Sequence, residues 1–558
     1  MPPLRRLVLA PLLALACSRS ATVTGVAPAR STAAISASDL RARLFAFAHD
    51  SMQGREPGYI GNFKASAYMA AEFARIGLQP AGDNGTWFQV VPFYWLKADG
   101  TLLLTVDGAP IQIGTDIAPM AVPALPRPVE GASVIFGGSV SDPSSWIDEG
   151  TARGHVVILS APASDGTRAT SPLRFVGGAA RAPNFASAAL VCIVGIEAAG
   201  SSTVAQVLSG SLVQDTTRRS DIAPIALIST AAAHRLLGAS PVGLAAGTVG
   251  RTVHGRVAVG IFPLEYAARN VVAVLPGSDP ALRGQYVSLT AHNDHVGFDR
   301  MPVDHDSLRA FNRVIRPMGA DTPPREPNET ERVRIRTILD SLRTAQPTRA
   351  DSIRNGADDD GTGSVALVEV AEQLAAGPRP KRSVLFVSHT AEEYGLLGSK
   401  WFTDHPTVTR DSIVSEIDMD MIGRGGSMDL PDAGPAYIEV IGLRRLSSEF
   451  GDIMDRVNAR QAAPFKFNLT YDQPGHPLQY YCRADHYMYA RYGIPSIALS
   501  RGEHLDYHQV TDEAQYIDYD ALARVATLVH DAALELASLD HRPKLDKPKG
   551  DPNAPCRQ

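Results

Sequence analysis

Cysteine is scarce in this sequence: 558 residues contain four, at positions 17, 192, 482 and 556. Beyond Cys17 an odd number remains at scattered positions, so we expect no disulfide framework, and cysteine is not expected to carry the chemistry. Cys192 lies in the apolar run 190–194. It is expected to be a small buried hydrophobic residue.

Excess positive charge is also absent. The 53 lysines and arginines are outnumbered by 59 aspartates and glutamates, which gives a net charge of -6. This balance offers no basic surface for nucleic acid, so no DNA or RNA partner is expected. With 44% hydrophobic and 20% charged residues, the chain can build a substantial core. The composition indicates a globular protein, and the length excludes one small module.

A long apolar run is missing at the N-terminus. The run 7–16 follows Arg5 and Arg6 and has ten residues, short of the ~20 that span a bilayer. Residues 1–17 are therefore predicted to be an export signal. Cleavage after Ala16 and lipidation of Cys17 both fit, although Ala14 stands where lipoprotein signals usually have leucine. The protein is expected to be exported: periplasmic, secreted, or anchored to the outer membrane through Cys17.

Hydrophobic patterning divides the rest of the chain. Short β-like runs separated by glycine, serine and proline predict a β-rich insert. After it, the apolar segments 270–275, 286–290, 384–387, 437–441 and 497–499 alternate with helical patterns, which predicts an open mixed α/β sheet flanked by helices. The polar stretch 299–355 is expected to be a lid or a solvated excursion. The predicted organisation is a linker at 18–38, a main domain at 39–120 and 261–540, the insert at 121–260, and a tail at 541–558.

Side chains that could bind metal follow the predicted strands at their carboxyl ends, where ligand sites form in open α/β sheets. His292, a candidate metal ligand, and Asp294 come directly after the strand 286–290. Aspartates 358–360 lie between glycines before a helical pattern. Adjacent carboxylates repel one another unless solvent or cations neutralise them. This segment is therefore either a metal-binding turn or an exposed acidic turn that caps the next helix.

A pair of glutamates forms the third motif. Glu392 and Glu393 follow the apolar strand 384–387. Adjacent glutamates are common at solvated helix starts. Here, however, a strand delivers them to the same edge of the sheet as His292, so a role in the site is expected.

Two further motifs lie closer to the C-terminus. Asp420 belongs to the mostly apolar segment 417–423, where a buried carboxylate needs a partner or a metal. Tyr507 and His508 come shortly after the strand 497–499. A histidine in isolation is more often structural, so the order of all five motifs is the stronger signal.

Taken in this order, the motifs resemble metallopeptidase family 28, the di-zinc aminopeptidases, whose relatives include glutamate carboxypeptidase and glutaminyl cyclase. The resemblance extends to Gly395-Leu396-Leu397-Gly398-Ser399, to Asp485-His486 and to residues 493–495. It implies the zinc exopeptidase fold. The insert at 121–260 resembles the protease-associated domain of many members.

The resemblance also implies a ligand set. His292 and Asp420 would bind one zinc, Glu393 and His508 the other, and Asp359 would bridge both. Nitrogen and carboxylate ligands suit zinc, and each ion keeps an open position for water or substrate. Three carboxylates with a bridging hydroxide would neutralise two Zn²⁺ ions.

The remaining roles follow from the same resemblance. Glu392 would be the general base, Tyr507 would donate a hydrogen bond to the oxyanion, and Asp294 would orient His292. We expect the neighbouring histidines to be structural rather than ligands. They are His295, His389, His486 and His504.

The implied function is an exported zinc exopeptidase, in the first place an aminopeptidase acting on peptides or aminoacyl compounds. Carboxypeptidase or glutaminyl-cyclase activity is the alternative. A carboxypeptidase would need cationic groups, for which Arg424, Arg483 and Arg501 are available. A non-catalytic binding protein is disfavoured, because all five ligands and the base are present.

Overall fold

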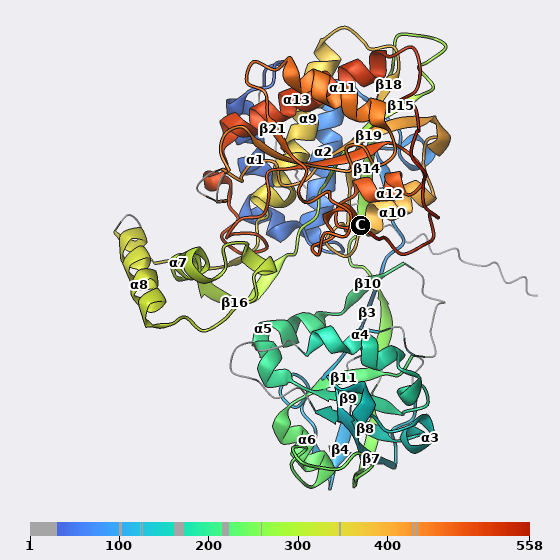
Figure 1. Ribbon diagram of the computed structural model, residues 1–558, viewed down its shortest axis with the longest axis vertical. Coiled ribbons are helices and arrows are strands. Elements are labelled where there is room, and N and C mark those ends of the chain that lie inside the picture. The colour runs from blue at the N-terminus through green and yellow to red at the C-terminus, as the bar shows by residue number, and fades with distance from the viewer. Residues whose placement is uncertain are drawn as a thin grey trace, which may run out of the picture.

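The computed structural model describes residues 31–99, 103–122, 124, 127–160, 172–214, 222–257, 259–344, 348–426, 429–430 and 433–558. The predicted export signal, Cys17 and the linker as far as residue 30 lie outside these ranges. Figure 1 shows a large α/β body at the top, a smaller inserted body below it, and an arm that extends to one side.

The large body is built on a mixed sheet. In the described residues this sheet has nine strands in the order β1-β14-β18-β15-β19-β22-β20-β21, with β2 also paired to β14. Strands β18, β15, β19 and β22 run parallel, whereas β14 and β20 flank them antiparallel. The carboxyl ends of the four parallel strands therefore share one edge. The strands are β1 (Gln79–Pro80), β2 (Phe88–Val90), β14 (Arg269–Leu275), β15 (Tyr286–His292), β18 (Ser383–His389), β19 (Ile413–Met419), β20 (Tyr437–Ile441), β21 (Lys466–Asn468) and β22 (Ser496–Ser500).

Helices cover both faces of the sheet. Alternate side chains of a strand point to opposite faces. In β14, Val271 and Ala273 join the main core cluster, whereas Val272 joins a second cluster with Phe402 and Tyr489. The first face packs on α1 (Ala37–Phe47), α2 (Ile60–Ile76), α9 (Gly363–Ala376), α11 (Ser448–Ala459) and α13 (Tyr519–Ser538), the second on α10 (Leu397–Asp404) and α12 (His486–Ala490). The predicted mixed α/β sheet is confirmed.

The inserted body has its own sheet, in which the described residues form eight strands in the order β5-β4-β12-β7-β8-β9-β11-β6. This sheet begins at Leu103, ahead of the boundary expected at 121, because β4 pairs with the distant β12. Helices accompany its strands, so the insert is less purely β than its sequence pattern indicates. The elements are β4 (Leu103–Val106), β5 (Ala109–Pro110), β6 (Ile117–Pro119), β7 (Ala132–Ser139), α3 (Glu149–Ala152), β8 (Val156–Ser160), α4 (Leu173–Arg181), β9 (Leu190–Val194), α5 (Ile196–Ser209), β11 (Ile225–Ile228), α6 (Thr230–Leu237) and β12 (Val249–Arg256).

A small sheet of β10 (Ser211–Val213), β3 (Tyr94–Ala98) and β13 (Val259–Pro263) lies where the two bodies meet (Figure 1). The arm corresponds to the polar stretch 299–355. It contains β16 (Phe298–Asp304), α7 (His305–Ile315), α8 (Glu329–Arg343) and β17 (Ala350–Ile353). Helix α8 begins with a capping box between Asn328 and Glu331, which satisfies free N–H groups of its first turn.

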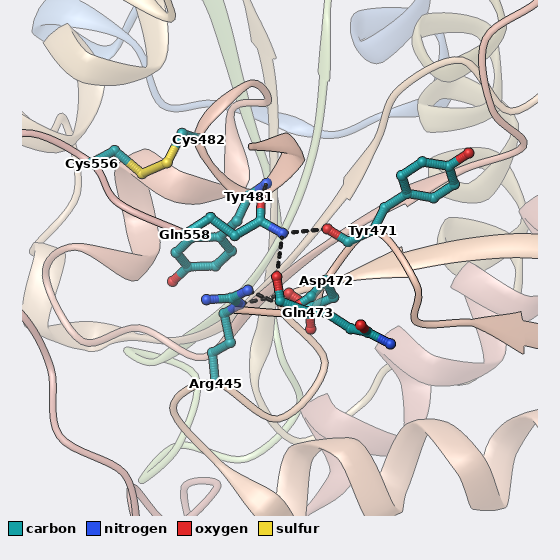
Figure 2. Close-up of a disulfide and its surroundings, with 8 residues drawn as sticks. All are labelled: Arg445, Tyr471, Asp472, Gln473, Tyr481, Cys482, Cys556 and Gln558. Carbon is teal, nitrogen blue, oxygen red and sulfur yellow. Dashed lines mark hydrogen bonds and ion pairs between the residues drawn. A yellow bond between two sulfur atoms is a disulfide. The ribbon is translucent and has the colours of Figure 1, made fainter. Parts of the chain in front are cut away.

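A disulfide joins Cys482 to Cys556 (Figure 2). The expectation of no disulfide framework was therefore wrong for this pair. The two cysteines are 74 residues apart in sequence, and the C-terminal segment brings them together by running back over the main domain. Gln558 helps to hold that segment: its side-chain amide donates to the carbonyl of Gln473 at 3.0 Å, and its side-chain oxygen accepts from the N–H of Tyr481 at 2.9 Å. Cys192 is free and buried, as expected.

Within the described residues, none of the helices combines the length and the apolar character needed to cross a membrane.

Candidate active site

Two groups of histidine and carboxylate side chains meet at the carboxyl edge of the parallel strands. In the first group, His292 ends β15 and Asp420 follows β19. The Nε2 atom of His292 lies 3.1 Å from Oδ1 of Asp359 and 3.7 Å from Oδ1 of Asp420. These three residues could hold one cation.

The second group lies on the other side of Asp359. Nε2 of His508 is 2.9 Å from Oδ2 of Asp359 and 2.8 Å from Oε2 of Glu393. Nδ1 of His295 is 2.7 Å from Oε1 of Glu393 and 3.7 Å from Oδ2 of Asp359. Asp359 thus presents one carboxylate oxygen to each group, which is the geometry of a shared ligand.

The unpaired atoms at these groups fit a bound cation. Among the described residues, neither ring nitrogen of His292 or His295 has a hydrogen-bond partner, and Nε2 of His508 also lacks one. Carboxylate oxygens nevertheless lie within 4 Å of them. Buried polar atoms that converge without bonding one another are costly unless something else satisfies them. Nitrogen and carboxylate donors in this arrangement suit a zinc-type ion.

His295 is a residue that sequence reasoning missed. It was expected to be structural, yet it is fully buried against Glu393. The signal was its place three residues after His292 on the same turn. Sequence order could not show that this turn brings both rings to the site.

The three consecutive aspartates have different partners. Asp359 faces the two groups, whereas Asp360 accepts hydrogen bonds from the N–H of His292 at 3.0 Å and of Gly363 at 2.9 Å. Asp358 lies 3.1 Å from Nε2 of His504. All three are buried, so the alternative of an exposed acidic turn is wrong. The bond from Gly363 to Asp360 satisfies an N–H at the start of α9, whereas the N-cap residue Thr362 makes no side-chain cap hydrogen bond.

Glu392 lies beside the first group without belonging to it. Its Oε2 is 3.9 Å from Nε2 of His292, and its side chain lines a cavity. Asp294 accepts hydrogen bonds from the N–H groups of Glu392 at 3.1 Å and Glu393 at 3.4 Å. The same carboxylate lies 3.6 Å from Nδ1 of His292. Asp294 therefore fixes the turn that carries Glu392 and Glu393, here called the glutamate turn. It also lies next to the ring of His292.

The electrostatics of the centre favour the binding of positive charge. Burial raises the pKa of Glu392 well above its usual range. Burial opposes ionisation of Asp359, but His292 and His508 outweigh it and hold the pKa of Asp359 well below its usual range. Burial would lower the pKa of His508, yet Glu393 and Asp359 raise it to about 10. Carboxylates that force nearby histidines to keep their protons would also favour a metal cation.

Tyr507 points its ring toward the same site. It lines the cavity, and its ring centroid is 4.0 Å from that of His508. Its hydroxyl lies 3.5 Å from Nη2 of Arg483. A hydroxyl at this position can donate to an oxygen that gains negative charge.

The base of the arm supports the loop that carries Tyr507. The N–H of Ala320 donates to the carbonyl of Tyr507 at 3.0 Å, and Nη1 of Arg309 pairs with Asp506 at 3.0 Å. Asn312 donates to the carbonyl of Leu505 at 3.0 Å. The stretch 299–355 thus braces one wall of the site through α7 and the 3-10 turn that follows it.

Other residues named from the sequence lie away from the two groups. His389 contacts the hydroxyl of Tyr489 at 3.0 Å, and burial lowers the pKa of His389 to about 3. Arg424 pairs with Asp506 and Asp429. His486, His504 and Arg501 likewise belong to neither group, and among the three arginines considered for a carboxylate substrate Arg483 lines the cavity.

A mixed α/β sheet with a histidine–carboxylate centre at the carboxyl ends of its parallel strands defines a class of α/β metalloproteins. Residues 270–533 match the model of peptidase family M28. The matched segment contains both groups and covers slightly less than half of the chain, so this domain resembles the peptidases of that family.

Curated relatives agree with this assignment. Leucine aminopeptidase 1 of Paracoccidioides brasiliensis (strain Pb18) is 30% identical over 193 residues, which is 33% of this chain and 46% of that protein. Vacuolar membrane protease of Candida glabrata is 29% identical over 168 residues, 30% of this chain and 16% of that protein. The chain therefore spans less than half the length of these two relatives.

Solved structures share the fold. The aminopeptidase from Aneurinibacillus sp. strain AM-1 aligns with a TM-score of 0.51 at 15% identity, over 92% of this chain and 98% of that one. BSAP, a zinc aminopeptidase from Bacillus subtilis, aligns with a TM-score of 0.51 at 15% identity, over 90% and 96%. The fold expected from the motifs is thereby confirmed.

Proposed function

We propose that this chain is a zinc-dependent aminopeptidase that removes N-terminal residues from peptides with the help of two zinc ions. One observation carries the proposal: Asp359 offers one oxygen to each of two histidine–carboxylate groups beside a cavity. The similarity to a leucine aminopeptidase and to a zinc aminopeptidase supports it.

The donor atoms suggest how the ions would be held. His292 and Asp420 would bind one zinc, Glu393 and His508 the other, and Asp359 both. His295 contacts Oε1 of Glu393, whereas His508 contacts Oε2. His295 would therefore orient Glu393 for its ligand role, as outer partners of metal ligands commonly do.

The residues around the centre have separate tasks. Zinc, when bound, supplies Lewis-acid polarisation of the scissile carbonyl and acidifies the attacking water. Glu392 takes a proton from that water and returns it to the leaving amine, since it lines the cavity without belonging to either group. The hydroxyl of Tyr507 donates a hydrogen bond to the developing oxyanion. Asp294 keeps the glutamate turn in place through its backbone contacts.

The charge beside the centre supports aminopeptidase over carboxypeptidase action. Arg483, which lines the cavity, lies 2.8 Å from Asp321 and 3.5 Å from Glu503. Its charge is thus already paired with carboxylates. A carboxypeptidase needs an available cation for the substrate's carboxylate, whereas this cavity favours a cationic amine.

Export is part of the proposal, with the inserted body acting as a protease-associated domain. The disulfide between Cys482 and Cys556 supports an oxidising compartment. Mass spectrometry of the mature N-terminus tests the export signal. A chain starting at an acylated Cys17 would establish a lipoprotein, an unmodified start near that position would establish a secreted or periplasmic protein, and a retained Met1 would refute export.

Metal analysis combined with an activity panel tests the enzymatic proposal. We expect about two zinc ions per purified chain. Hydrolysis of aminoacyl-nitroanilides should be lost on chelation and restored by zinc. N-acetylated versions of the same substrates serve as controls and should resist hydrolysis, because an aminopeptidase needs the free amine. Absence of bound zinc after resupply, or cleavage of the acetylated substrates, would refute the proposal.

A further inference from the structure

Carboxylates that belong to neither metal group line the cavity beside the centre. The cavity is partly open to solvent and is lined by both polar and apolar side chains. Its wall includes Glu392 and Tyr507, which adjoin the two metal groups, and also Glu439 and Glu503.

Glu439 is a buried carboxylate with an unused oxygen. It lies on β20 and is 2% exposed. Its Oε1 accepts a hydrogen bond from the hydroxyl of Tyr437 at 2.6 Å. Its Oε2 has no hydrogen-bond partner among the described residues. An unpartnered buried carboxylate is costly, so a cationic ligand entering the cavity would gain an interaction that the chain itself leaves open.

Glu503 supplies a second carboxylate beside the first. It follows β22, is 5% exposed, and accepts a hydrogen bond from the hydroxyl of Tyr480. A Cβ placed on the adjacent Gly502 would lie 2.9 Å from Oε1 of Glu439, which brings the two glutamates to the same part of the wall. Burial raises the pKa of each carboxyl to about 7.

The charged groups near this wall leave a negative excess. Arg483 provides a positive charge, but it is shared between Glu503 and Asp321. Glu439 has no cation among its described contacts. Ile441 and Ala498 provide apolar lining in the same cavity. An apolar wall that ends in carboxylates matches a side chain with an aliphatic stem and a cationic end.

We propose that Glu439 and Glu503 form the subsite for the side chain of the substrate's N-terminal residue, and that this side chain is lysine or arginine. The proposal rests on the aminopeptidase function proposed above and names its substrate class. A leucine side chain in the same place would leave Oε2 of Glu439 without a partner, which disfavours leucine relative to lysine.

Matched substrates test the specificity of the zinc-loaded enzyme. We expect kcat/KM for lysyl- and arginyl-nitroanilide to exceed that for leucyl- and norleucyl-nitroanilide by about tenfold or more. Norleucine has the linear stem of lysine without its charge and is therefore the sharpest control. Faster hydrolysis of the leucyl and norleucyl substrates would overturn the subsite while leaving the aminopeptidase function standing.

Variants then assign the preference to the two carboxylates. Glu439→Gln keeps the size of the side chain and should reduce the lysyl-to-norleucyl ratio by about tenfold. Glu503→Gln should reduce the same ratio independently. Asp520→Asn, an exposed carboxylate in the first turn of α13, is the control and should leave the ratio as in the wild type. An equal loss on both substrates in Glu439→Gln would assign the carboxylate to the substrate's α-ammonium group and overturn the proposal.

A binding experiment tests the subsite independently of the proposed aminopeptidase activity. Calorimetric titration of the zinc-loaded protein with L-lysine and L-norleucine requires no turnover. We expect lysine to bind about tenfold more tightly, and Glu439→Gln to remove the difference. Selective lysine binding without hydrolysis of any nitroanilide would keep the subsite and reject the aminopeptidase. Equal binding of the two amino acids would reject the subsite.

Discussion

Glu392 and Glu393 are adjacent on one turn, and exchanging each for glutamine should have different effects on metal content. Oε2 of Glu393 lies 2.8 Å from Nε2 of His508, inside the second group. Glu392 approaches the nearest ring nitrogen at 3.9 Å and belongs to neither group. Glu392→Gln should therefore retain about two zinc ions per chain, whereas Glu393→Gln should lose about one.

The kinetic effect of Glu392→Gln follows from its role as a base. Removing a general base typically lowers kcat by about 10²–10⁴-fold, which corresponds to about 3–5 kcal/mol of transition-state stabilisation. KM should change little, because the amide keeps the shape of the side chain. Asp294 accepts the N–H groups of both glutamates, so the turn should survive either exchange.

The assay combines plasma emission for zinc with steady-state hydrolysis of a lysyl-nitroanilide. Glu326→Gln, an exposed glutamate of the arm, serves as the control for the same chemical change and should match the wild type in both measurements. Loss of zinc in Glu392→Gln would make Glu392 a ligand and refute the assigned roles. Full turnover in that variant would refute the general base.

Three other perturbations have defined outcomes. Tyr507→Phe should lower kcat about 10²–10³-fold with unchanged zinc content, because it removes a donor to the oxyanion; unchanged kcat would exclude that role. The lysyl-to-norleucyl ratio of kcat/KM should rise as pH increases from 6 to 8, since the Glu439 carboxyl, with its pKa raised by burial to about 7, gains its charge over this range; a flat ratio would contradict the assignment. Cys556→Ser opens a disulfide that closes a loop of 74 residues and should cost about 2–4 kcal/mol of stability. The reduced wild type should then melt at the same temperature as the variant, and an unchanged melting temperature in both would refute a stabilising disulfide.

Much of the candidate centre was predictable because its residues stand next to strands that their apolar runs reveal. His292 follows the strand 286–290, and Glu392 and Glu393 follow the strand 384–387. Parallel strands place their carboxyl ends at one edge of the sheet. Local pattern and strand order together therefore predict that these side chains lie near one another. Asp359 lies between the two groups, with Oδ1 near His292 and Oδ2 near His508.

Other features depend on contacts between distant segments. Local periodicity could not show that β4 pairs with β12, so the second sheet begins earlier than expected. The disulfide depends on the path of the C-terminal segment across the main domain, which carries Cys556 to Cys482. The spacing of the cysteines along the sequence carries no information about the path of the C-terminal segment.

The sequence by itself determined the class of fold and the ordered set of candidate ligands, because these depend on short motifs attached to regular elements. Only the tertiary structure decided that His295 contacts Glu393, that the arm braces the loop carrying Tyr507, and that Glu439 and Glu503 share a cavity wall. The physical reason is that burial and charge pairing arise from segments remote in the chain. A glutamate on a strand becomes a specific site when folding removes its water and leaves one of its oxygens without a partner.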